Sequence, residues 1–574
     1  MEKNKVALVS LSFVILLAGL VAVAVTVSHL NSNASSINNP PTESPRPNTS
    51  IKAIQTVCQP TDYKDACQKT LSSFSHNTTD HMELVNVAFS ASMKYVTDVF
   101  DRSELLKEVS KDPASTEALQ TCRELLEYAM DDLKKSIVQL GNVHKNLYEQ
   151  AVEDLKVWLS AAITYQDTCV DGFEGINTSA AETMRQAIEN STQITSNALA
   201  MVNQLDVLVR SLNISSLLRR KLLSDAGANE FPSWMPAAQR RLLKVRPAKI
   251  MPNVTVAQDG TGDFETITEA LAQVPKDNNA TFVIYVKAGV YKERFLVDKH
   301  MTKVTMIGDG PTKTKITGNV SVIAGEISTF KTATVAVAGE WFVGIGLGFE
   351  NTAGPEKHQA VALRVNADRS VFYNCRMDGY QDTLYAHSER QFYRDCTITG
   401  TIDFIFGDSA TIFQNCMIIA RKPMDNQQNI VTAQGRKERQ GNGAIVLQNC
   451  TITSDPAYYP HRKVLPTYLG RPWKPYSRTL ILQSQLDDLI HPDGWLPWTG
   501  DVGLDTCFYA ELDNRGPGAD LTKRVTWPGI KNLTYVEAQE YTIENYLYGQ
   551  TWISRAGVPF IPGLLPATEA KRIH

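Results

Sequence analysis

The chain has 574 residues, a formal net charge of −4 and 43% hydrophobic residues. One hydrophobic core rarely serves such a length, so two or more domains are expected. The balanced charge, with no dense basic stripe, excludes a nucleic-acid-binding protein of the usual basic type. Function must therefore come from particular sites in the chain.

The N-terminus begins with an apolar segment. Residues 6–28 are uncharged, rich in Val, Leu and Ala, and follow Lys3 and Lys5. A secretory signal core has about 7–15 apolar residues, whereas about 20 residues span a bilayer. A cleaved signal peptide within residues 1–29 and a retained anchor that holds the precursor in the membrane both stay open. Either one sends the chain into the secretory pathway, and we expect membrane contact only here.

Glycosylation signals and cysteines agree with secretion. Asn-X-Ser/Thr triplets, the acceptors of N-glycosylation, begin at Asn33, Asn48, Asn77, Asn177, Asn190, Asn213, Asn253, Asn279, Asn319, Asn449 and Asn532. The chain also has 9 cysteines, which in an oxidising compartment imply disulfides with at least one thiol left over. We therefore expect a secreted glycoprotein.

A flexible linker is predicted over residues 30–51 and a helical bundle over 52–215. The linker is rich in Asn, Ser and Pro. Within the bundle region apolar residues recur at steps of four and three, for example at Leu126, Met130 and Leu133, as they do on one helical face. Proline is nearly absent there, so we expect an up-and-down bundle of about four long helices.

A second linker, residues 216–249, contains two basic clusters. They are Arg-Arg-Lys at 219–221 and Arg-Arg at 240–241. A solvated charged connector is the ordinary interpretation of such clusters. Because they separate two differently patterned domains of a secreted chain, we favour at least one as a processing site that releases the C-terminal domain.

Residues 250–560 have short β-rich runs and an internal repeat. A large apolar residue stands three positions before each of four cysteines, Cys375, Cys396, Cys416 and Cys450. Short strands that repeat at about 20 residues indicate a right-handed parallel β-helix. Its coils lie about 4.8 Å apart, a spacing that a disulfide tolerates. We expect Cys396 to bond to Cys416, with Cys375 as an equally placed competitor.

Two acids and two glutamines follow the same period. Asp382 and Asp403 are 21 residues apart, and Gln359 and Gln381 are 22 apart, so a β-helix stacks each pair on one face. Polar ladders on a solenoid surface would show the same spacing. Aromatic neighbours favour a catalytic site, because two partly desolvated carboxylates divide into an ionised nucleophile and a protonated general acid.

At these residues the chain resembles the plant pectin methylesterases. Five motifs of that family occur in order, and they are Gly289-Val290-Tyr291-Lys292-Glu293, Gln359-Ala360-Val361-Ala362-Leu363-Arg364, Gln381-Asp382-Thr383-Leu384, Asp403-Phe404-Ile405-Phe406-Gly407 and Leu469-Gly470-Arg471-Pro472-Trp473. The resemblance covers most of residues 250–550. It implies a carboxylic-ester hydrolase that removes methyl esters from the homogalacturonan of pectin and releases methanol. We expect no cofactor and no metal ion.

The resemblance assigns the catalytic roles residue by residue. Asp403 resembles the nucleophile, and Asp382 resembles the acid that protonates methanol and then the base that activates water. Gln381 resembles the oxyanion stabiliser, assisted by Gln359. Arg471 resembles the cation that keeps the nucleophile ionised and oriented.

Substrate contacts are implied in the same way. Trp473 resembles a sugar-stacking platform and Thr329 a substrate contact, while Tyr380 and Phe404 are expected to line the groove. His387 has no counterpart in the family's chemistry, and we expect it in an exposed turn.

The helical region resembles the pectin methylesterase inhibitor family. Cys58 and Cys67 match its early cysteine pair and Cys122 and Cys169 its later pair, which implies a disulfide within each pair. The resemblance implies a pro-domain that inhibits the enzyme or assists its folding. The basic clusters resemble sites cut by subtilisin-like proteases, and separate inhibitor proteins are further expected partners.

Two other classes of function stay in view. A carbohydrate-binding or inhibitory protein would have the β-helix without turnover, against which the intact acids argue. A pectate-lyase-like β-helix would need a Ca²⁺ site and a basic proton abstractor, and the acidic pair with its glutamines suits ester hydrolysis better. The sequence thus predicts a pectinesterase proenzyme that is secreted to the cell wall, or apoplast.

Overall fold

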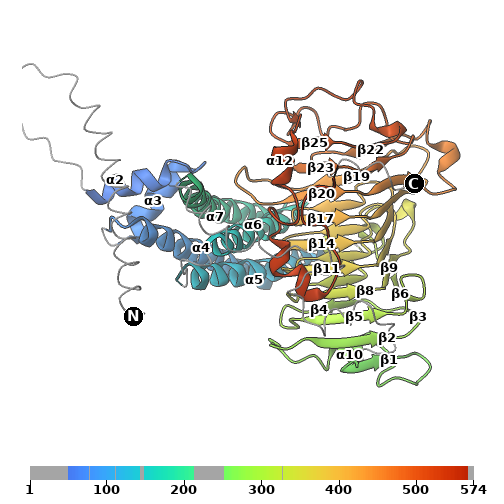
Figure 1. Ribbon diagram of the computed structural model, residues 1–574. Helices are drawn as coiled ribbons and strands as arrows, with labels where there is room; N and C mark the ends of the chain where they lie inside the picture. Colours follow the sequence, from blue (N-terminus) through green and yellow to red (C-terminus); the bar gives the residue numbers. More distant parts are fainter. Residues whose placement is uncertain are drawn as a thin grey trace, which may run out of the picture. The chain divides into compact units, whose positions relative to one another are not determined.

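The computed structural model describes residues 49–75, 78–109, 112–141, 148–211, 251–325 and 327–566. The apolar segment and the basic clusters predicted as processing sites lie outside these residues. From Ala53 onward the described residues belong to one unit, which contains both a helical region and a β-helix (Figure 1). Within the described ranges, no helix is both long enough and apolar enough to cross a membrane.

Long helices form the N-terminal region. They are α2 (Thr49–Cys58), α3 (Lys64–Phe74), α4 (His81–Val109), α5 (Pro113–Gly141), α6 (Tyr148–Asp171) and α7 (Ser179–Ser211). The apolar stripe of α5 is buried, with Leu126 and Leu133 at 0% exposure. Disulfides join Cys58 to Cys67 and Cys122 to Cys169, the two pairs that the resemblance implies.

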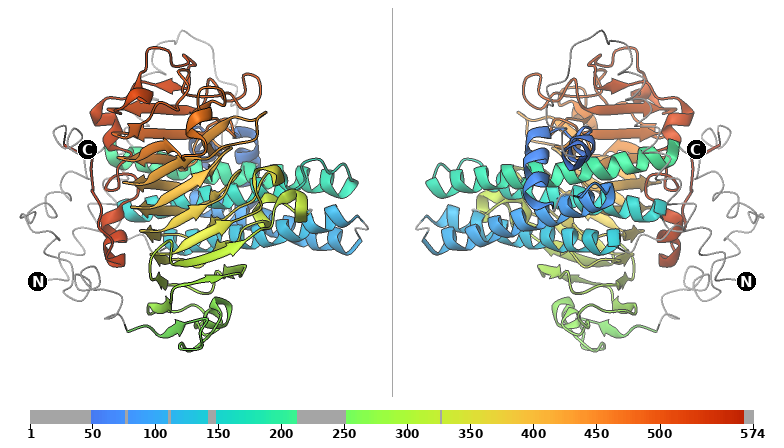
Figure 2. Two further views of the ribbon diagram at one scale, coloured as in Figure 1. Left: turned by 90° about the vertical axis from the view of Figure 1, so that its right-hand side faces the viewer. Right: turned by 90° about the vertical axis from the view of Figure 1, so that its left-hand side faces the viewer.

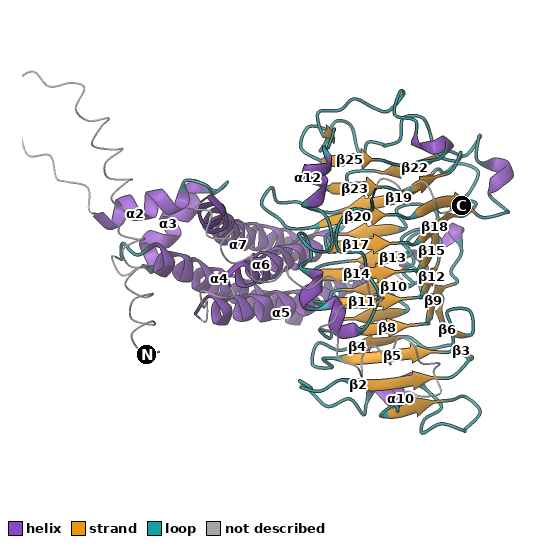
Figure 3. Ribbon diagram, viewed as in Figure 1, coloured by secondary structure: helices purple, strands orange, loops and turns teal. Residues whose placement is uncertain are grey.

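Three parallel sheets form the β-helix (Figure 3). The 11-stranded sheet contains β1 (Val254–Val256), β2 (Phe282–Val286), β5 (Val304–Gly308), β8 (Val343–Ile345), β11 (Ser370–Tyr373), β14 (Arg390–Arg394), β17 (Ala410–Gln414), β20 (Ala444–Gln448), β23 (Arg478–Leu482), β25 (Phe508–Leu512) and β26 (Ile530–Lys531). The 8-stranded sheet contains β3 (Gly289–Tyr291), β6 (Thr314–Gly318), β9 (Gly348–Asn351), β12 (Arg376–Asp378), β15 (Thr397–Gly400), β18 (Met417–Ala420), β21 (Thr451–Ser454) and β24 (Gln485–Leu486). The 7-stranded sheet contains β4 (Phe295–Val297), β7 (Val335–Val337), β10 (Leu363–Val365), β13 (Leu384–Ala386), β16 (Ile405–Gly407), β19 (Asn429–Gln434) and β22 (Thr467–Gly470).

Successive coils stack in register around an apolar interior. Leu384 of β13 pairs with Ile405 of β16, one coil further along. Inside the coils Phe372, Tyr393 and Phe413 stack with ring centroids 5.0 and 4.5 Å apart. The prediction of an all-α bundle followed by a right-handed parallel β-helix is confirmed.

The repeated motif marks a turn between the 11-stranded and 8-stranded sheets. The residue before each repeated cysteine has a positive φ, and these residues are Asn374, Asp395, Asn415 and Asn449, with φ of 49°, 52°, 58° and 51°. Asn and Asp adopt this left-handed conformation more readily than other side-chain-bearing residues. The repeat therefore encodes a backbone turn at one position of each coil.

The expected disulfide between Cys396 and Cys416 is wrong. Both cysteines are free and buried, as are Cys375, Cys450 and Cys507. In the four repeats the thiols project in one direction, and each donates to a main-chain carbonyl of the preceding coil at 3.3 to 3.5 Å. Coil spacing brings these sulfur atoms near one another, but their parallel orientation pairs each thiol with a carbonyl instead.

The free cysteines give a count that can be tested. Denatured, unreduced protein should yield five thiol equivalents with a thiol reagent, because the two disulfides use four of the 9 cysteines. A Cys507→Ser control should yield one equivalent fewer. A count of three for the parent chain would show that a third disulfide forms.

Candidate active site

Asp382 and Asp403 occupy the same turn on successive coils. Each lies two residues before a strand of the 7-stranded sheet, β13 or β16. Both have left-handed backbone, with φ of 63° and 50°, and the Asp382 N–H donates to the Ile402 carbonyl at 3.0 Å. Asp adopts this left-handed conformation more readily than most residues with a side chain, so the two turns hold the acids at equivalent positions.

Both carboxyl groups are almost fully buried, and their surroundings separate their pKa values. Asp382 is 8% exposed and Asp403 is 4% exposed. Burial raises the pKa of Asp382 well above its ordinary value, and the charge of Asp403 raises it further. Burial also raises the pKa of Asp403, but hydrogen bonds and charge from Arg471 oppose that rise. Asp382 thus keeps its proton to higher pH, while Asp403 ionises first.

Arg471 holds Asp403 with a two-pronged ion pair. Its Nε lies 2.9 Å and its Nη2 2.5 Å from the two carboxylate oxygens. Arg471 directly follows β22, and its own N–H donates to the Thr432 carbonyl at 3.0 Å. The guanidinium lies 4.1 Å from the ring centroid of Trp498. Bidentate geometry fixes the direction of the carboxylate as well as its charge.

Gln359 and Gln381 also stack one coil apart, since the N–H of Ala360 donates to the Gln381 carbonyl at 3.2 Å. Gln381 and Arg471 line a cavity of about 450 Å³. The side-chain oxygen of Gln381 is buried and has no hydrogen-bond partner within the described part of the chain. The cavity therefore offers amide and guanidinium groups to a polar ligand beside the two acids.

An aromatic wall adjoins the acids on the outer face of the 7-stranded sheet. Tyr385 and Phe406 stack with centroids 4.2 Å apart, and Trp473 lies 6.1 Å from Phe406. Tyr385 and Phe406 were not predicted as part of the site, although each stands three residues after a candidate catalytic acid. The groove position expected for Phe404 is wrong, because its side chain is 0% exposed and packs in the β-helix core.

Thr329, Tyr380 and His387 lie outside this aromatic wall. Thr329 begins the 3₁₀ turn η3 (Thr329–Lys331) just before β7, two strands from β13. The Arg421 guanidinium stacks on the ring of Tyr380, 3.9 Å from the ring centroid. His387 is 0% exposed, so its expected place in an exposed turn is wrong. Its Nε2 is 2.8 Å from the Thr168 hydroxyl of α6, which covers it.

Helices α5 and α6 cover the sheet face beside the acids (Figure 2). From α6, the Thr164 hydroxyl donates to Asp408 at 2.8 Å. At the C-terminal end of the same helix, Asp171 accepts a hydrogen bond from the ammonium group of Lys474, the neighbour of Trp473 in sequence, at 2.6 Å. Among the described residues no group of three or more His, Cys, Asp or Glu is placed to hold a metal ion.

Comparisons with known families match both regions. The pectinesterase model matches residues 253–550. The model described as plant invertase/pectin methylesterase inhibitor matches residues 52–201.

Individual relatives match both regions together. The Arabidopsis thaliana protein named putative pectinesterase/pectinesterase inhibitor 28 is 48% identical over 563 residues, which is 98% of this chain and 75% of the relative. Probable pectinesterase/pectinesterase inhibitor 21 of the same plant is 45% identical over 571 residues, 99% of this chain and 84% of the relative. A solved pectin methylesterase from carrot is 46% identical and has a TM-score of 0.55, covering 56% of this chain and 100% of its own.

The ion pair at the site predicts a pH-dependent loss of stability. Arg471→Leu leaves Asp403 buried without its cation, which should lower the free energy of unfolding by about 3 kcal/mol at neutral pH. Because the folded pKa of Asp403 is raised, the loss should shrink as pH falls through that pKa and the group becomes neutral. Urea unfolding at several pH values measures both effects.

The double variant Asp403→Asn/Arg471→Leu is the control. With no charge at position 403, removing the arginine should cost much less at neutral pH. An equal loss in both backgrounds would contradict a charge-based role for the pair.

Proposed function

Because the chain belongs to the pectinesterase family, with an N-terminal domain of the pectin methylesterase inhibitor family, we propose that Asp403, Asp382 and Gln381 hydrolyse the methyl esters of pectin. The chain is thus a pectin methylesterase, and the substrate is methyl-esterified homogalacturonan. The observation that carries the residue roles is the pair of stacked, buried acids of which one alone is held by Arg471.

In the first half of the reaction, the Asp403 carboxylate attacks the carbonyl carbon of a methyl galacturonate unit. The side-chain amide of Gln381, assisted by Gln359, donates hydrogen bonds to the oxyanion that forms. When this intermediate collapses, the bond from carbonyl carbon to methoxy oxygen breaks. Asp382, which burial keeps protonated, gives its proton to that oxygen, and methanol leaves. The galacturonate carbonyl is then joined to Asp403 as an acyl-enzyme.

In the second half, Asp382 is ionised and acts as a base. It takes a proton from water, whose oxygen attacks the acyl carbonyl. The bond to Asp403 breaks, so that Asp403 is again a carboxylate and Asp382 again holds a proton. The sum is ester plus water giving a uronic acid and methanol, without any cofactor.

We propose that the protein is made as a proenzyme and acts in the plant cell wall. The segment 6–28 would carry it into the secretory pathway, as a signal peptide or an anchor. A subtilisin-like protease would cut at 219–221 or 240–241, between a bundle over 52–215 and a catalytic domain over 250–560. Trp473 would stack on a sugar and Thr329 would contact the substrate at the other side of the acids. Separate inhibitor proteins of the same helical family would be further partners.

Loss of the nucleophile tests the reaction directly. Asp403→Asn should reduce methanol release from methylated pectin by at least about four orders of magnitude, since an amide cannot form the acyl-enzyme. Asp408→Asn, a change at a half-buried acid outside the reaction centre, is the matched control and should keep activity. Retained methanol release in Asp403→Asn would refute the nucleophile role. Unsaturated, ultraviolet-absorbing oligosaccharides in place of methanol would instead indicate a lyase.

A cut in the linker should activate the enzyme. Helix α6 covers the aromatic wall and Lys474 beside the acids, so long pectin chains meet a shortened groove in the uncut protein. Cleavage between 216 and 249 followed by removal of the bundle should raise kcat/KM on long pectin by about tenfold or more, the gain from one recovered sugar contact. Methanol release before and after cleavage measures this, and an unchanged rate would contradict inhibition by the bundle.

A further inference from the structure

In most ion pairs between the bundle and the β-helix, the cation belongs to the β-helix and the acid to the bundle. Lysines of the β-helix pair with acids of the bundle, and the pairs are Lys299 with Asp131 at 2.6 Å, Lys331 with Glu124, Lys437 with Asp167 at 2.7 Å, and Lys474 with Asp171 at 2.6 Å. Among the described residues Lys135 alone pairs in the opposite sense, with Glu340 and Glu389. Most ion pairs across this contact therefore join a cation of the β-helix to an acid of the bundle.

These cations lie on both sides of the catalytic acids. Lys331 ends η3 before β7, two strands before β13, where Asp382 lies. Lys437 follows β19 and Lys474 follows β22, which are the two strands after β16. Lys474 also lies 5.0 Å from the ring of Trp473. A chain of sugars that crosses the acids would meet cations before and after the reacting unit.

Arg364 adds an incompletely paired cation to the face that the bundle covers. Its side chain is 4% exposed, and its guanidinium stacks on Phe330 at 3.3 Å. Its nearest acid is Glu124 of the bundle, at 3.9 Å. Two of its nitrogens, Nε and Nη1, are buried without a hydrogen-bond partner in the described structure. A planar carboxylate in this place would satisfy Arg364 better than Glu124 does.

Arg390, another cation under the bundle, differs in having a partner within the β-helix. Arg390 donates to both oxygens of Asp368, within the β-helix, at 2.8 and 2.5 Å. Removal of the bundle would leave that pair intact. We call Lys331, Arg364, Lys437 and Lys474 the cation row. Every acid with which they form a salt bridge in the described structure belongs to the bundle, as is also true of Lys299 and of the more exposed Arg439.

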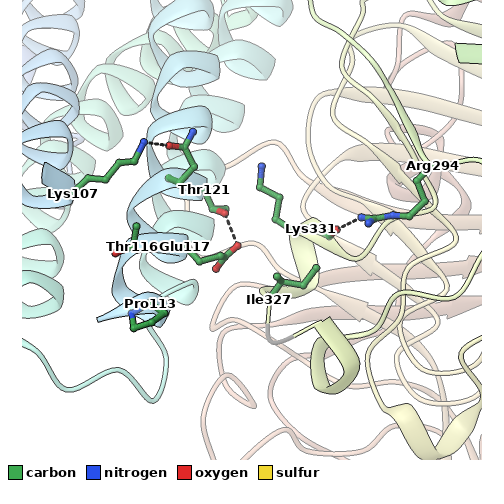
Figure 4. Close-up of a pocket in the computed structure, with 9 residues that line it drawn as sticks. Lys107, Pro113, Thr116, Glu117, Thr121, Arg294, Ile327 and Lys331 are labelled. Atoms are coloured by element: carbon green, nitrogen blue, oxygen red, sulfur yellow. Dashed lines mark hydrogen bonds between the residues drawn. The ribbon is translucent and has the colours of Figure 1, made fainter. Parts of the chain in front are cut away.

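A cavity gives access to one end of the cation row. It has a volume of about 700 Å³ and lies between α4 and α5 on one side and Arg294, Ile327 and Lys331 on the other (Figure 4). The bundle itself contributes Lys107 to this cavity. An anionic chain can therefore approach Lys331 while the bundle is still in place.

We propose that the cation row binds carboxylates of demethylated galacturonan, and that acids of the bundle occupy these places until such a chain displaces them. This proposal rests on the proposed function, because ester hydrolysis turns a neutral methyl ester into a carboxylate. The bundle presents the same chemical group, a carboxylate, to the same cations. The product of the reaction thus competes with the bundle, and demethylated stretches promote its release.

Displacement of the bundle is the direct test. The full chain carries Asp403→Asn, so that no ligand is turned over, and a specific protease site between residues 222 and 239. After folding it is cut, and the two parts are followed by size-exclusion chromatography with light scattering. Added ligands are a demethylated oligogalacturonate, its fully methyl-esterified form, and polyglutamate of equal charge.

The demethylated oligomer should release the bundle at a concentration at least about tenfold below that of polyglutamate, because sugar stacking and fixed carboxylate spacing add to charge. The methyl-esterified form should release none. Equal potency of oligogalacturonate and polyglutamate would overturn the proposal in favour of simple screening, and so would equal potency of the two sugar oligomers or no release at all. Since the test uses inactive protein, its outcome is independent of the catalytic roles.

A kinetic test decides the case in which the cut bundle leaves without any ligand. In the cut, active protein, Lys331→Gln/Lys474→Gln should raise KM for partly demethylated pectin several-fold more than it raises KM for fully methylated pectin. Lys315→Gln is the matched control, because Lys315 of β6 pairs with Glu350 of the β-helix itself. An equal change in KM for both pectins, or no change, would overturn the proposal.

Discussion

Parallel pairing between successive coils is the constraint on which the rest of the site depends. It converts a separation of one coil in sequence into a distance of one strand spacing in space. Asp382 and Asp403 become neighbours because they hold equivalent turn positions, each with left-handed backbone, before β13 and β16. The hydrogen bond from the Asp382 N–H to the Ile402 carbonyl fixes that relation. Once the acids are neighbours, burial and the single cation Arg471 are enough to separate their pKa values.

Much of this arrangement can be predicted because the sequence repeats at intervals of one coil. The repeat before each cysteine gives the coil length, and the same length relates the acids and the glutamines. What the period does not give is the direction of a side chain. Cys396 and Cys416 lie one coil apart, yet their thiols point alike and bind carbonyls. Phe404 and Phe406 flank Ile405 at the start of β16, and only the structure shows that Phe404 packs in the β-helix core while Phe406 packs with residues of the bundle.

Contacts between the helical region and the β-helix are the part that local pattern cannot predict. His387 has the sequence context of an exposed turn, and it is buried because Thr168, 219 residues away, lies on it. Lys474 and Asp171 are 303 residues apart. No periodicity links such positions, since their pairing follows from the docking of two separately formed surfaces. The two motifs that contain Asp382 and Asp403 were therefore predictable, while the residues that contact His387 and Lys474 were not.

The buried ion pairs between the bundle and the β-helix fix the orientation of the bundle but add little net stability. Asp154 of α6 accepts from both Arg369 and Arg390 at 2.6 Å, in a setting where all three are nearly buried. Taking such charges out of water costs most of what their attraction returns, so buried pairs specify geometry more than they add stability. Nearby, burial raises the pKa of Asp132 to about 7, against the opposing charge of Lys135. An interface built in this way sets the bundle in one orientation over the acids, and the small net stability of its buried ion pairs supports our proposal that a cut and a competing anion release the bundle.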